Sequence, residues 1–272
     1  MRWSERQTAM LHEMGVRCWY PAPPPQGEAD CTLLPPAEQG VGAAVAALRS
    51  DEVAAVERVA AVTGEVALGD VATLGWGELR EAVVGCTACG LCKGRRQAVF
   101  GVGHQRAHWM IVGEAPGEQE DIQGEPFVGK SGQLLDNMLR AIGLGRGDLP
   151  GVDADAAAAR QVYIANTIKC RPPGNRNPEP DELARCEPFL VRQLQLVQPK
   201  IILAMGRFAV QSLLRSSDPI GRLRGRVHRY QGLPLIVTYH PAYLLRNPEE
   251  KAKAWDDLCL AVSTVRAAQA SA

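Results

Sequence analysis

The stretch from residue 109 to 132, WMIVGEAPGEQEDIQGEPFVGKSG, constrains the fold and the function of this chain more than any other. It begins with the apolar run 109–112, which is typical of a buried parallel strand. A turn at 113–117 follows, and a helix is expected to open at Lys130. Ligands of open α/β sheets bind at the carboxyl ends of the strands. The stretch therefore predicts a binding site, and the alternative is a solvated connection between strand and helix.

Three further apolar runs along the chain are typical of strands that alternate with helices. The expected strands cover 161–168, 200–204 and 233–237, and the expected helices cover 131–143, the segment after Pro180, the segment after Gly206, and 248–266. This alternation predicts a three-layer α/β/α fold with a central, mostly parallel four-stranded sheet. The segment 151–160 is expected to form a variable surface loop.

Composition and charge restrict the class of protein. No apolar run approaches the ~18 residues that a membrane helix needs. The chain begins MRWSERQTAM and lacks the apolar core of a signal peptide, so we expect a cytoplasmic protein. The formal net charge is 0, but residues 1–85 hold 6 basic and 12 acidic residues, whereas residues 86–272 hold 24 basic and 18 acidic ones. An anionic partner is therefore expected to bind the second part.

Residues 1–75 are expected to form an extension, and residues 76–272 to form the domain that carries the motifs. The extension is predicted to contain a short helix at 4–16, a proline-rich linker and an Ala-rich helix at 41–62. Its start is similar to that of the psi subunit of bacterial replicative polymerase holoenzymes, which implies a docking tail for a replication or repair protein. The alternative is a disordered extension with a weakly helical tip.

Eight cysteines in a chain expected to be cytoplasmic favour a metal or redox site over disulfides. Cys86 and Cys89 form a C-x-x-C pair, and Cys92 follows three residues later. Any further ligands must come from distant parts of the chain, where Cys170 and Cys186 are the candidates. Such a set suits a structural zinc or a [4Fe–4S] cluster. A redox-active pair and unligated core thiols are the alternatives.

Five motifs occur in one order and at compatible spacings: GEAPG at 113–117, PFVGKSG at 126–132, NTIKCRPP at 166–173, GNRNP at 174–178 and HPAYLLR at 240–246. Together they resemble the family 4 uracil-DNA glycosylases, the iron–sulfur branch of the uracil-DNA glycosylase superfamily. The resemblance covers roughly residues 77–266. It implies a DNA repair enzyme that flips uracil out of DNA and hydrolyses its N-glycosidic bond without cutting the strand. A monomer is expected, without a membrane partner.

The resemblance also implies the ligands of the cofactor. A structural [4Fe–4S] cluster would be held by Cys86, Cys89, Cys170 and Cys186, and Cys92 would remain a spare thiol.

The residues expected to bind uracil or orient the water lie in the five motifs, apart from Glu120 between the first two. Phe127 would stack under the base, Asn166 would read its N3/O4 edge and His240 would face O2. Glu114 is the first candidate for orienting the water. The remaining positions expected at the base or the water are Gly113, Ala115, Glu120 and Asn175.

DNA contacts are expected from basic residues and from one apolar segment. The segment 243–246 is expected to enter the gap left by the flipped base, and the contacts assigned are Lys130, Arg171, Arg176, Tyr243, Leu244, Leu245 and Arg246. DNA, single- or double-stranded, is thus the expected partner. Three competing functions remain: a glycosylase for another deaminated base, a non-catalytic iron–sulfur DNA-binding protein, and a zinc-stabilised nucleotide-binding module.

Overall fold

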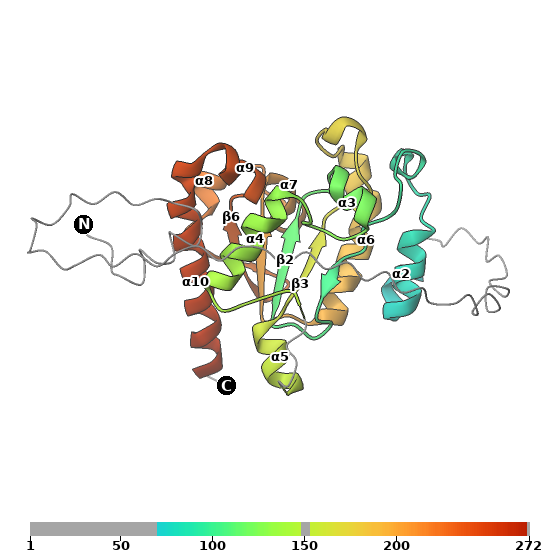
Figure 1. Cartoon of the computed structure of the whole chain (residues 1–272). Helices are drawn as coiled ribbons and strands as arrows, with labels where there is room; N and C mark the ends of the chain where they lie inside the picture. The colour runs from blue at the N-terminus through green and yellow to red at the C-terminus, as the bar shows by residue number, and fades with distance from the viewer. Residues whose placement is uncertain (1–69, 148–152, 271–272) are drawn as a thin grey trace, which may run out of the picture. The chain divides into compact units, whose positions relative to one another are not determined.

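The computed structural model describes residues 70–147 and 153–270 (Figure 1). The extension at 1–75, with its predicted helices and partner-docking tail, lies outside the described residues up to residue 69. In the described part of the chain, no helix has the length and apolar character that crossing a bilayer would take.

One sheet of six strands lies at the centre, in the order β1-β3-β2-β4-β6-β5. The strands are β1 (Val102–Gly103), β2 (Trp109–Gly113), β3 (Val162–Asn166), β4 (Ile201–Met205), β5 (Val227–Tyr230) and β6 (Leu233–Thr238). Strands β3, β2, β4 and β6 are parallel, and β1 and β5 pair antiparallel at the two edges. The predicted parallel four-stranded core is confirmed, and the two edge strands are additions to it.

The α-helices of the described residues are α2 (Trp76–Val84), α3 (Glu118–Gln123), α4 (Lys130–Ala141), α5 (Ala154–Arg160), α6 (Pro180–Val197), α7 (Arg207–Leu214), α8 (Ile220–Leu223), α9 (Pro241–Arg246) and α10 (Lys251–Ala270). Short 3₁₀ turns cover Asp70–Thr73, Gly90–Lys93, Pro173–Asn175 and Pro248–Glu250.

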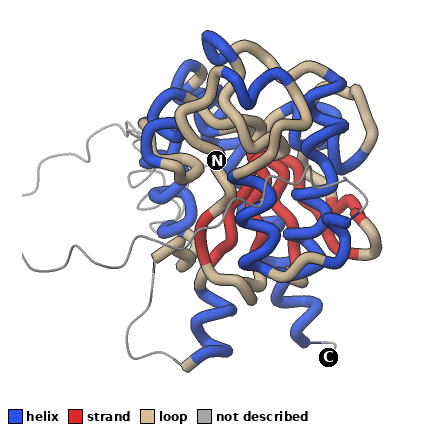
Figure 2. Tube along the Cα trace, turned by 90° about the vertical axis from the view of Figure 1, so that its right-hand side faces the viewer, coloured by secondary structure: helices blue, strands red, loops and turns tan. Residues whose placement is uncertain are grey.

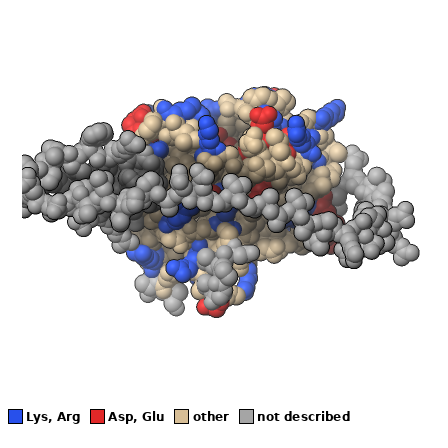
Figure 3. Space-filling view, in the orientation of Figure 1, with Lys and Arg blue, Asp and Glu red and all other residues tan. Residues whose placement is uncertain are grey.

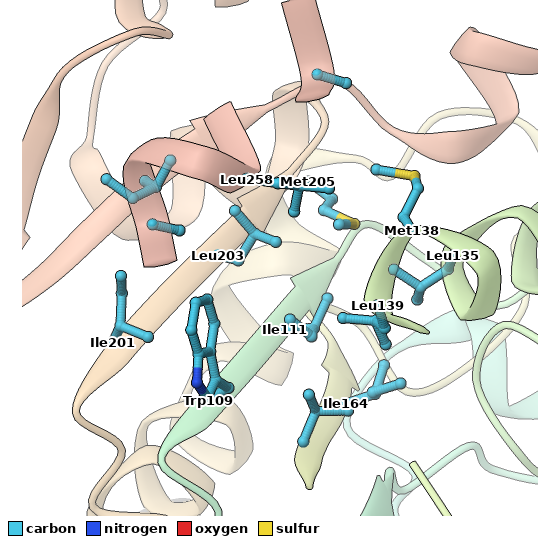
Figure 4. Close-up of a cluster of buried hydrophobic side chains, with 14 of the residues drawn as sticks. Trp109, Ile111, Leu135, Met138, Leu139, Ile164, Ile201, Leu203, Met205 and Leu258 are labelled. Carbon is cyan, nitrogen blue, oxygen red and sulfur yellow. The ribbon is translucent and has the colours of Figure 1, made fainter. Parts of the chain in front are cut away.

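Helices cover both faces of the sheet because the central strands are apolar on both sides. On one face, Trp109 and Ile111 of β2 pack with side chains of α4, α9 and α10 (Figure 4). On the other, Met110 and Val112 of the same strand pack with α6, α7 and α8. Figure 2 shows the strands enclosed between these helices. The predicted three-layer α/β/α arrangement is confirmed.

A third cluster of buried apolar side chains joins α2 to α6 and to the bend after β3. It includes Val71, which is 1% exposed, so the folded unit reaches back beyond the predicted start at Trp76. Cys170 and Cys186 are part of this cluster.

Two local predictions were wrong. The segment 151–160, expected to be a loop, contains α5, whose N-terminus is capped by the Asp153 carboxylate accepting from the N–H groups of Asp155 and Ala156. The segment 243–246, expected to be a wedge-forming loop, is the end of helix α9, which His240 caps at its N-terminus.

Candidate functional site

The carboxyl ends of the four parallel strands meet at one edge of the sheet, as in other open α/β folds. The register places Gly113 of β2 directly beside Asn166 of β3. Glu114 follows β2, and His240 follows β6 with one residue between. Glu114, Asn166 and His240 line a cavity of about 970 Å³, together with Phe127. The structure thus brings together side chains that are distant in the sequence: Glu114 and His240 are 126 residues apart.

Phe127 has an unusual backbone that its surroundings accommodate. Its φ is 55°, in the left-handed region that a bulky residue rarely adopts. A Cβ on Gly132 would collide with the Phe127 carbonyl, and a Cβ on Gly113 would lie 2.6 Å from the Phe127 Cζ. Gly132 therefore leaves room for the backbone of Phe127, and Gly113 leaves room for its ring. Phe127 stacks on His240 with ring centroids 5.2 Å apart, and the two rings form part of the cavity wall.

Asn166 lines the cavity and carries a buried polar atom without a partner in the described part of the chain. The residue is 2% exposed, and its side-chain Oδ1 has no hydrogen-bond partner among the described residues. A buried amide oxygen without a partner is costly unless a ligand supplies a donor. The Asn166 amide is therefore available to pair with a group that offers both a donor and an acceptor.

His240 is neutral and has a defined tautomer. Burial, together with the positive charge of Arg246, lowers the pKa of His240 to about 4. Its Nδ1 accepts the backbone N–H of Ala242 at 3.1 Å. Because Nδ1 is an acceptor, the single proton of the neutral ring is on Nε2. His240 can thus donate one hydrogen bond from Nε2 without carrying a charge.

Glu114 is the acidic side chain nearest to the strand end. Its Oε1 accepts the backbone N–H of Phe208, at the start of α7, at 3.1 Å. Burial raises the pKa of the Glu114 carboxyl, while the N–H groups of Phe208 and Arg207 and the charge of Arg207 oppose that rise. The carboxylate is thus held at the cavity wall by the N–H groups at the start of α7.

Glu120 and Asn175 line the same cavity but are occupied by other contacts. Glu120 accepts the backbone N–H groups of Gly117, Val128 and Gly129 at 3.0–3.2 Å, which fixes the loop that carries Phe127. The Asn175 Oδ1 accepts from Arg171 Nε at 2.8 Å. Their expected contacts with the base or the water stay predictions.

The residues expected to contact DNA divide into two groups. Arg246 lines the cavity and Lys130 is exposed at the start of α4. Arg176, by contrast, is bound by both oxygens of Glu182, at 2.5 and 2.9 Å. Leu244 is 0% exposed and packs in the core, so it has no surface to offer to DNA and its assignment is corrected. Leu245 is 43% exposed and Tyr243 lines the cavity. These two side chains remain the candidates for the predicted contact with the gap in the DNA.

Sequence reasoning missed some residues of the cavity. Arg207 lies directly after β4, exposed at the N-terminus of α7, and Pro219 to Gly221 form another part of the lining. Tyr239 also lines the cavity and stacks on Tyr243, with centroids 5.0 Å apart. The signal for Arg207 was its place after Gly206 at the carboxyl end of a strand. No pattern marked the segment 219–221.

Five cysteines line a second, smaller cavity between α2, the bend after β3, and α6. They are Cys86, Cys89, Cys92, Cys170 and Cys186. Arg95 Nη1 donates to the Cys170 sulfur at 2.9 Å, and the backbone N–H of Lys169 donates to the Cys186 sulfur at 3.3 Å. Within residues 70–147 and 153–270, no three His, Cys, Asp or Glu side chains form a recognisable single-metal site.

The chemistry of this cavity fits an electron-poor group that binds thiolates. Burial raises the pKa of Cys186 to about 12, and it also raises the pKa values of Cys170 and Cys89. Buried thiols of this kind lose their protons when a metal replaces them. The N–H donors of Arg95 and Lys169 already point to two of the sulfurs, where they would stabilise the thiolate form.

Gly113→Ala tests the packing of the cavity. The added methyl would meet the Phe127 ring and the Asn166 amide oxygen, so both must move from the wall. We expect any reaction in this cavity to slow by about 100-fold, as a displacement of ~1 Å commonly costs. Gly77→Ala is the control, because a Cβ at Gly77 has no atom within 4 Å. Equal single-turnover rates for the two variants would contradict this assignment of the cavity.

Comparison with known proteins identifies similar chains. The family model of the Uracil DNA glycosylase superfamily matches residues 100–259. A type-4 uracil-DNA glycosylase of Archaeoglobus fulgidus is 41% identical over 175 residues, which are 61% of this chain and 81% of that protein. Another, of Thermotoga maritima, is 41% identical over 169 residues, 61% of this chain and 81% of that protein. A third, of Pyrobaculum aerophilum, is 38% identical over 193 residues, 67% of this chain and 91% of that protein.

Proposed function

The chain belongs to the type-4 uracil-DNA glycosylases of the uracil-DNA glycosylase superfamily, and on this premise we propose that it releases uracil from DNA by hydrolysing the N-glycosidic bond. The unpaired amide oxygen of Asn166 is the observation that supports this function best. Uracil offers a donor at N3 and an acceptor at O4, which match the Oδ1 and Nδ2 of this amide. The base reaches the cavity only after it has been flipped out of the DNA stack.

The reaction leaves negative charge on the uracil and positive charge on the sugar. His240, neutral and protonated on Nε2, donates to uracil O2 as the negative charge develops there. The Ala242 N–H donates to Nδ1 and holds the imidazole in this orientation, so the ring does not have to turn during the reaction. The Phe127 ring bounds the space for the base beside His240.

We assign to Glu114 the stabilisation of the sugar cation and the orientation of the water. Its carboxylate, fixed by the Phe208 N–H, offsets the positive charge of the sugar and orients the attacking water through its other oxygen. Ala115, the next residue, has no polar side chain that could share this role. The reaction then ends with free uracil and an abasic site in an intact strand.

The surface around the cavity supports DNA as the substrate. Lys and Arg side chains gather at two places along the upper edge in Figure 3, with a few Asp and Glu side chains beside them, and α3 and α9 lie at this edge in Figure 1. Arg246 and Arg207 line the cavity itself. These cations would bind the phosphates on either side of the flipped nucleotide, and Leu245 would fill the vacated stack.

The cysteine-lined cavity would hold a [4Fe–4S] cluster on Cys86, Cys89, Cys170 and Cys186. The support is the convergence of these thiols from the turn after α2, the bend after β3 and α6, with two N–H donors at the sulfurs. The cluster would cross-link these three segments and so stabilise the fold. Cys92 lines the same cavity, and we propose that it does not coordinate the cluster.

Serine variants test this ligand set. Cys186→Ser and Cys170→Ser are expected to lose most of the iron and the broad absorbance at about 400 nm, because buried ligands are hard to replace. Cys92→Ser, the matched control in the same cavity, keeps both. Zinc in place of iron in the wild-type protein, or full loss of iron in Cys92→Ser, would contradict the assignment.

A panel of base lesions tests the function. Duplexes and single strands with one uracil, hypoxanthine, xanthine or thymine are incubated with the protein, and abasic sites are revealed by alkaline cleavage. We expect release of uracil and none of thymine. Release of hypoxanthine or xanthine without uracil would indicate a glycosylase for another deaminated base. Binding of DNA without release of any base would indicate a non-catalytic protein.

A further inference from the structure

The bend from Asn166 to Cys170 joins the two sites of this protein. It begins at the amide proposed to read uracil and ends, four residues later, at a proposed cluster ligand. Its backbone also holds the end of β2, because Thr167 N–H donates to the Gly113 carbonyl at 3.0 Å and Ile168 N–H donates to the Glu114 carbonyl at 3.3 Å. These two main-chain bonds tie the middle of the bend to the end of β2, and the Asn166 end of the bend is held by other contacts.

Lys169 lies inside the bend and is the largest fully buried side chain of the described residues. It is 1% exposed, although lysine is almost never fully buried without a partner. Its ammonium donates to the backbone carbonyl of Asn166 at 2.8 Å and to Gln193 Oε1 at 2.7 Å. No carboxylate pairs with it among the ion pairs of the described residues. A buried ammonium held only by neutral oxygens has a high cost, which calls for a specific role.

Gln193, on α6, makes this arrangement rigid. Its Nε2 donates to the Phe100 carbonyl at 2.8 Å and to the Tyr163 hydroxyl at 3.1 Å. Gln193 is 0% exposed, and its amide therefore has one orientation that satisfies all of these contacts. The Lys169 ammonium thus connects the Asn166 carbonyl to a fixed point on α6.

The main chain of Lys169 contacts the cysteine cavity. Its N–H donates to the Cys186 sulfur at 3.3 Å, and its carbonyl accepts the Val99 N–H at 2.7 Å. Lys169 is also one of the residues that line the cavity. A group bound by the cysteines with net negative charge would provide the buried ammonium with the counter-charge that it lacks.

We propose that Lys169 is a positioning residue that anchors Asn166 to the cysteine-lined cavity, so that the amide reads uracil only while both ends of the bend are held. The proposal rests on the proposed function of Asn166. It assigns the cysteine cavity an effect on base recognition that needs no electron transfer. Lys169 itself touches neither the base nor the sugar.

The test is a double-mutant cycle between Lys169→Met and Asn166→Ala. Methionine approximates the length of lysine and removes the ammonium. We expect Lys169→Met to slow single-turnover uracil release by about 10- to 100-fold, because the displaced amide loses its alignment. In the Asn166→Ala background the same change should cost less than about twofold, because the group through which Lys169 acts is already absent. Lys200→Met, exposed at the other end of the sheet, is the control and should retain the wild-type rate.

Two measurements do not depend on turnover. Iron content shows whether each variant keeps its cluster. The second is the affinity for a duplex that carries a 2′-fluoro analogue of deoxyuridine, whose glycosidic bond resists cleavage. Lys169→Met should bind this duplex more weakly than the wild type does, whereas the double variant should bind it as well as Asn166→Ala does. Equal losses in both backgrounds, or no loss in Lys169→Met, would overturn the proposal. If Lys169→Met loses iron, Gln193→Leu replaces it in the double-mutant cycle with Asn166→Ala. The effects of these two substitutions should again be non-additive, and additive effects would overturn the proposal.

These outcomes separate the proposal from the function on which it rests. A wild-type protein that releases no uracil refutes the proposed function. A wild-type protein that releases uracil, combined with additive effects in the cycle, refutes only the role of Lys169.

Discussion

His240→Ala is expected to slow uracil release by about 10²- to 10³-fold, the usual effect of removing one preorganised donor from a developing oxyanion. The reason is the neutral, Nε2-protonated ring that the Ala242 N–H holds in place. The substitution also removes the ring that stacks on Phe127. Single-turnover rates on a uracil-containing duplex measure the loss. His104→Ala, outside the cavity, is the control.

The pH dependence follows from the pKa of His240, which burial lowers to about 4 from an ordinary value of 6.5. The donor is therefore expected to remain neutral at every pH above about 5. Below 6.5 the unfolded chain binds the proton more readily than the folded one, so the stability that depends on a neutral His240 falls as pH decreases from 6.5 through 4. His240→Ala should remove this part of the acid destabilisation. An imidazole that titrates near 6.5 in the folded protein would contradict the assigned tautomer and charge.

Glu114→Gln is expected to slow uracil release by about 100-fold or more, the scale of a lost catalytic carboxylate. Glutamine keeps the shape of the side chain and an oxygen that can accept the Phe208 N–H, and it removes the charge. The effect therefore reports on charge near the sugar rather than on packing. Glu118→Gln makes the same charge change at an exposed neighbouring site and should leave the rate unchanged.

The pH profile provides an independent reading of Glu114. Burial raises the pKa of this carboxyl above 4.5, and the role that we propose for it requires the ionised form. Activity should therefore fall as pH decreases through that raised value, and the Gln variant should lack this fall. Equal rates for Glu114→Gln and Glu118→Gln would show that the water is oriented by another group.

Much of the fold could be predicted because its central strands are short apolar runs with distinct ends. The expected run at 200–204 is β4 (Ile201–Met205), and the run at 233–237 is β6 (Leu233–Thr238). The edge strands were missed for physical reasons. Strand β1 has two residues, and β5 alternates between exposed and half-buried positions without a strong apolar pattern. Helix α5 was missed because its Ala-rich sequence lies beside Gly and Asp residues that are typical of loops.

The grouping of Glu114, Asn166 and His240 was predictable because the carboxyl ends of parallel strands share one edge. The detailed contacts of neighbouring side chains were not. Sequence patterns do not reveal that Arg176 is bound by Glu182 or that Leu244 faces the core. Such choices depend on tertiary packing, which places a helix at 241–246 where a loop was expected.

The central claim is that this cavity reads uracil through Asn166 and releases it. The most direct measurement compares single-turnover release of the base from two duplexes that differ only in a U·G or a T·G pair, with the iron-loaded wild-type protein and with Asn166→Ala. We predict release from U·G alone, and a large loss of this rate in Asn166→Ala. Failure of the iron-loaded wild type to release uracil, or an unchanged rate in Asn166→Ala, would contradict the claim.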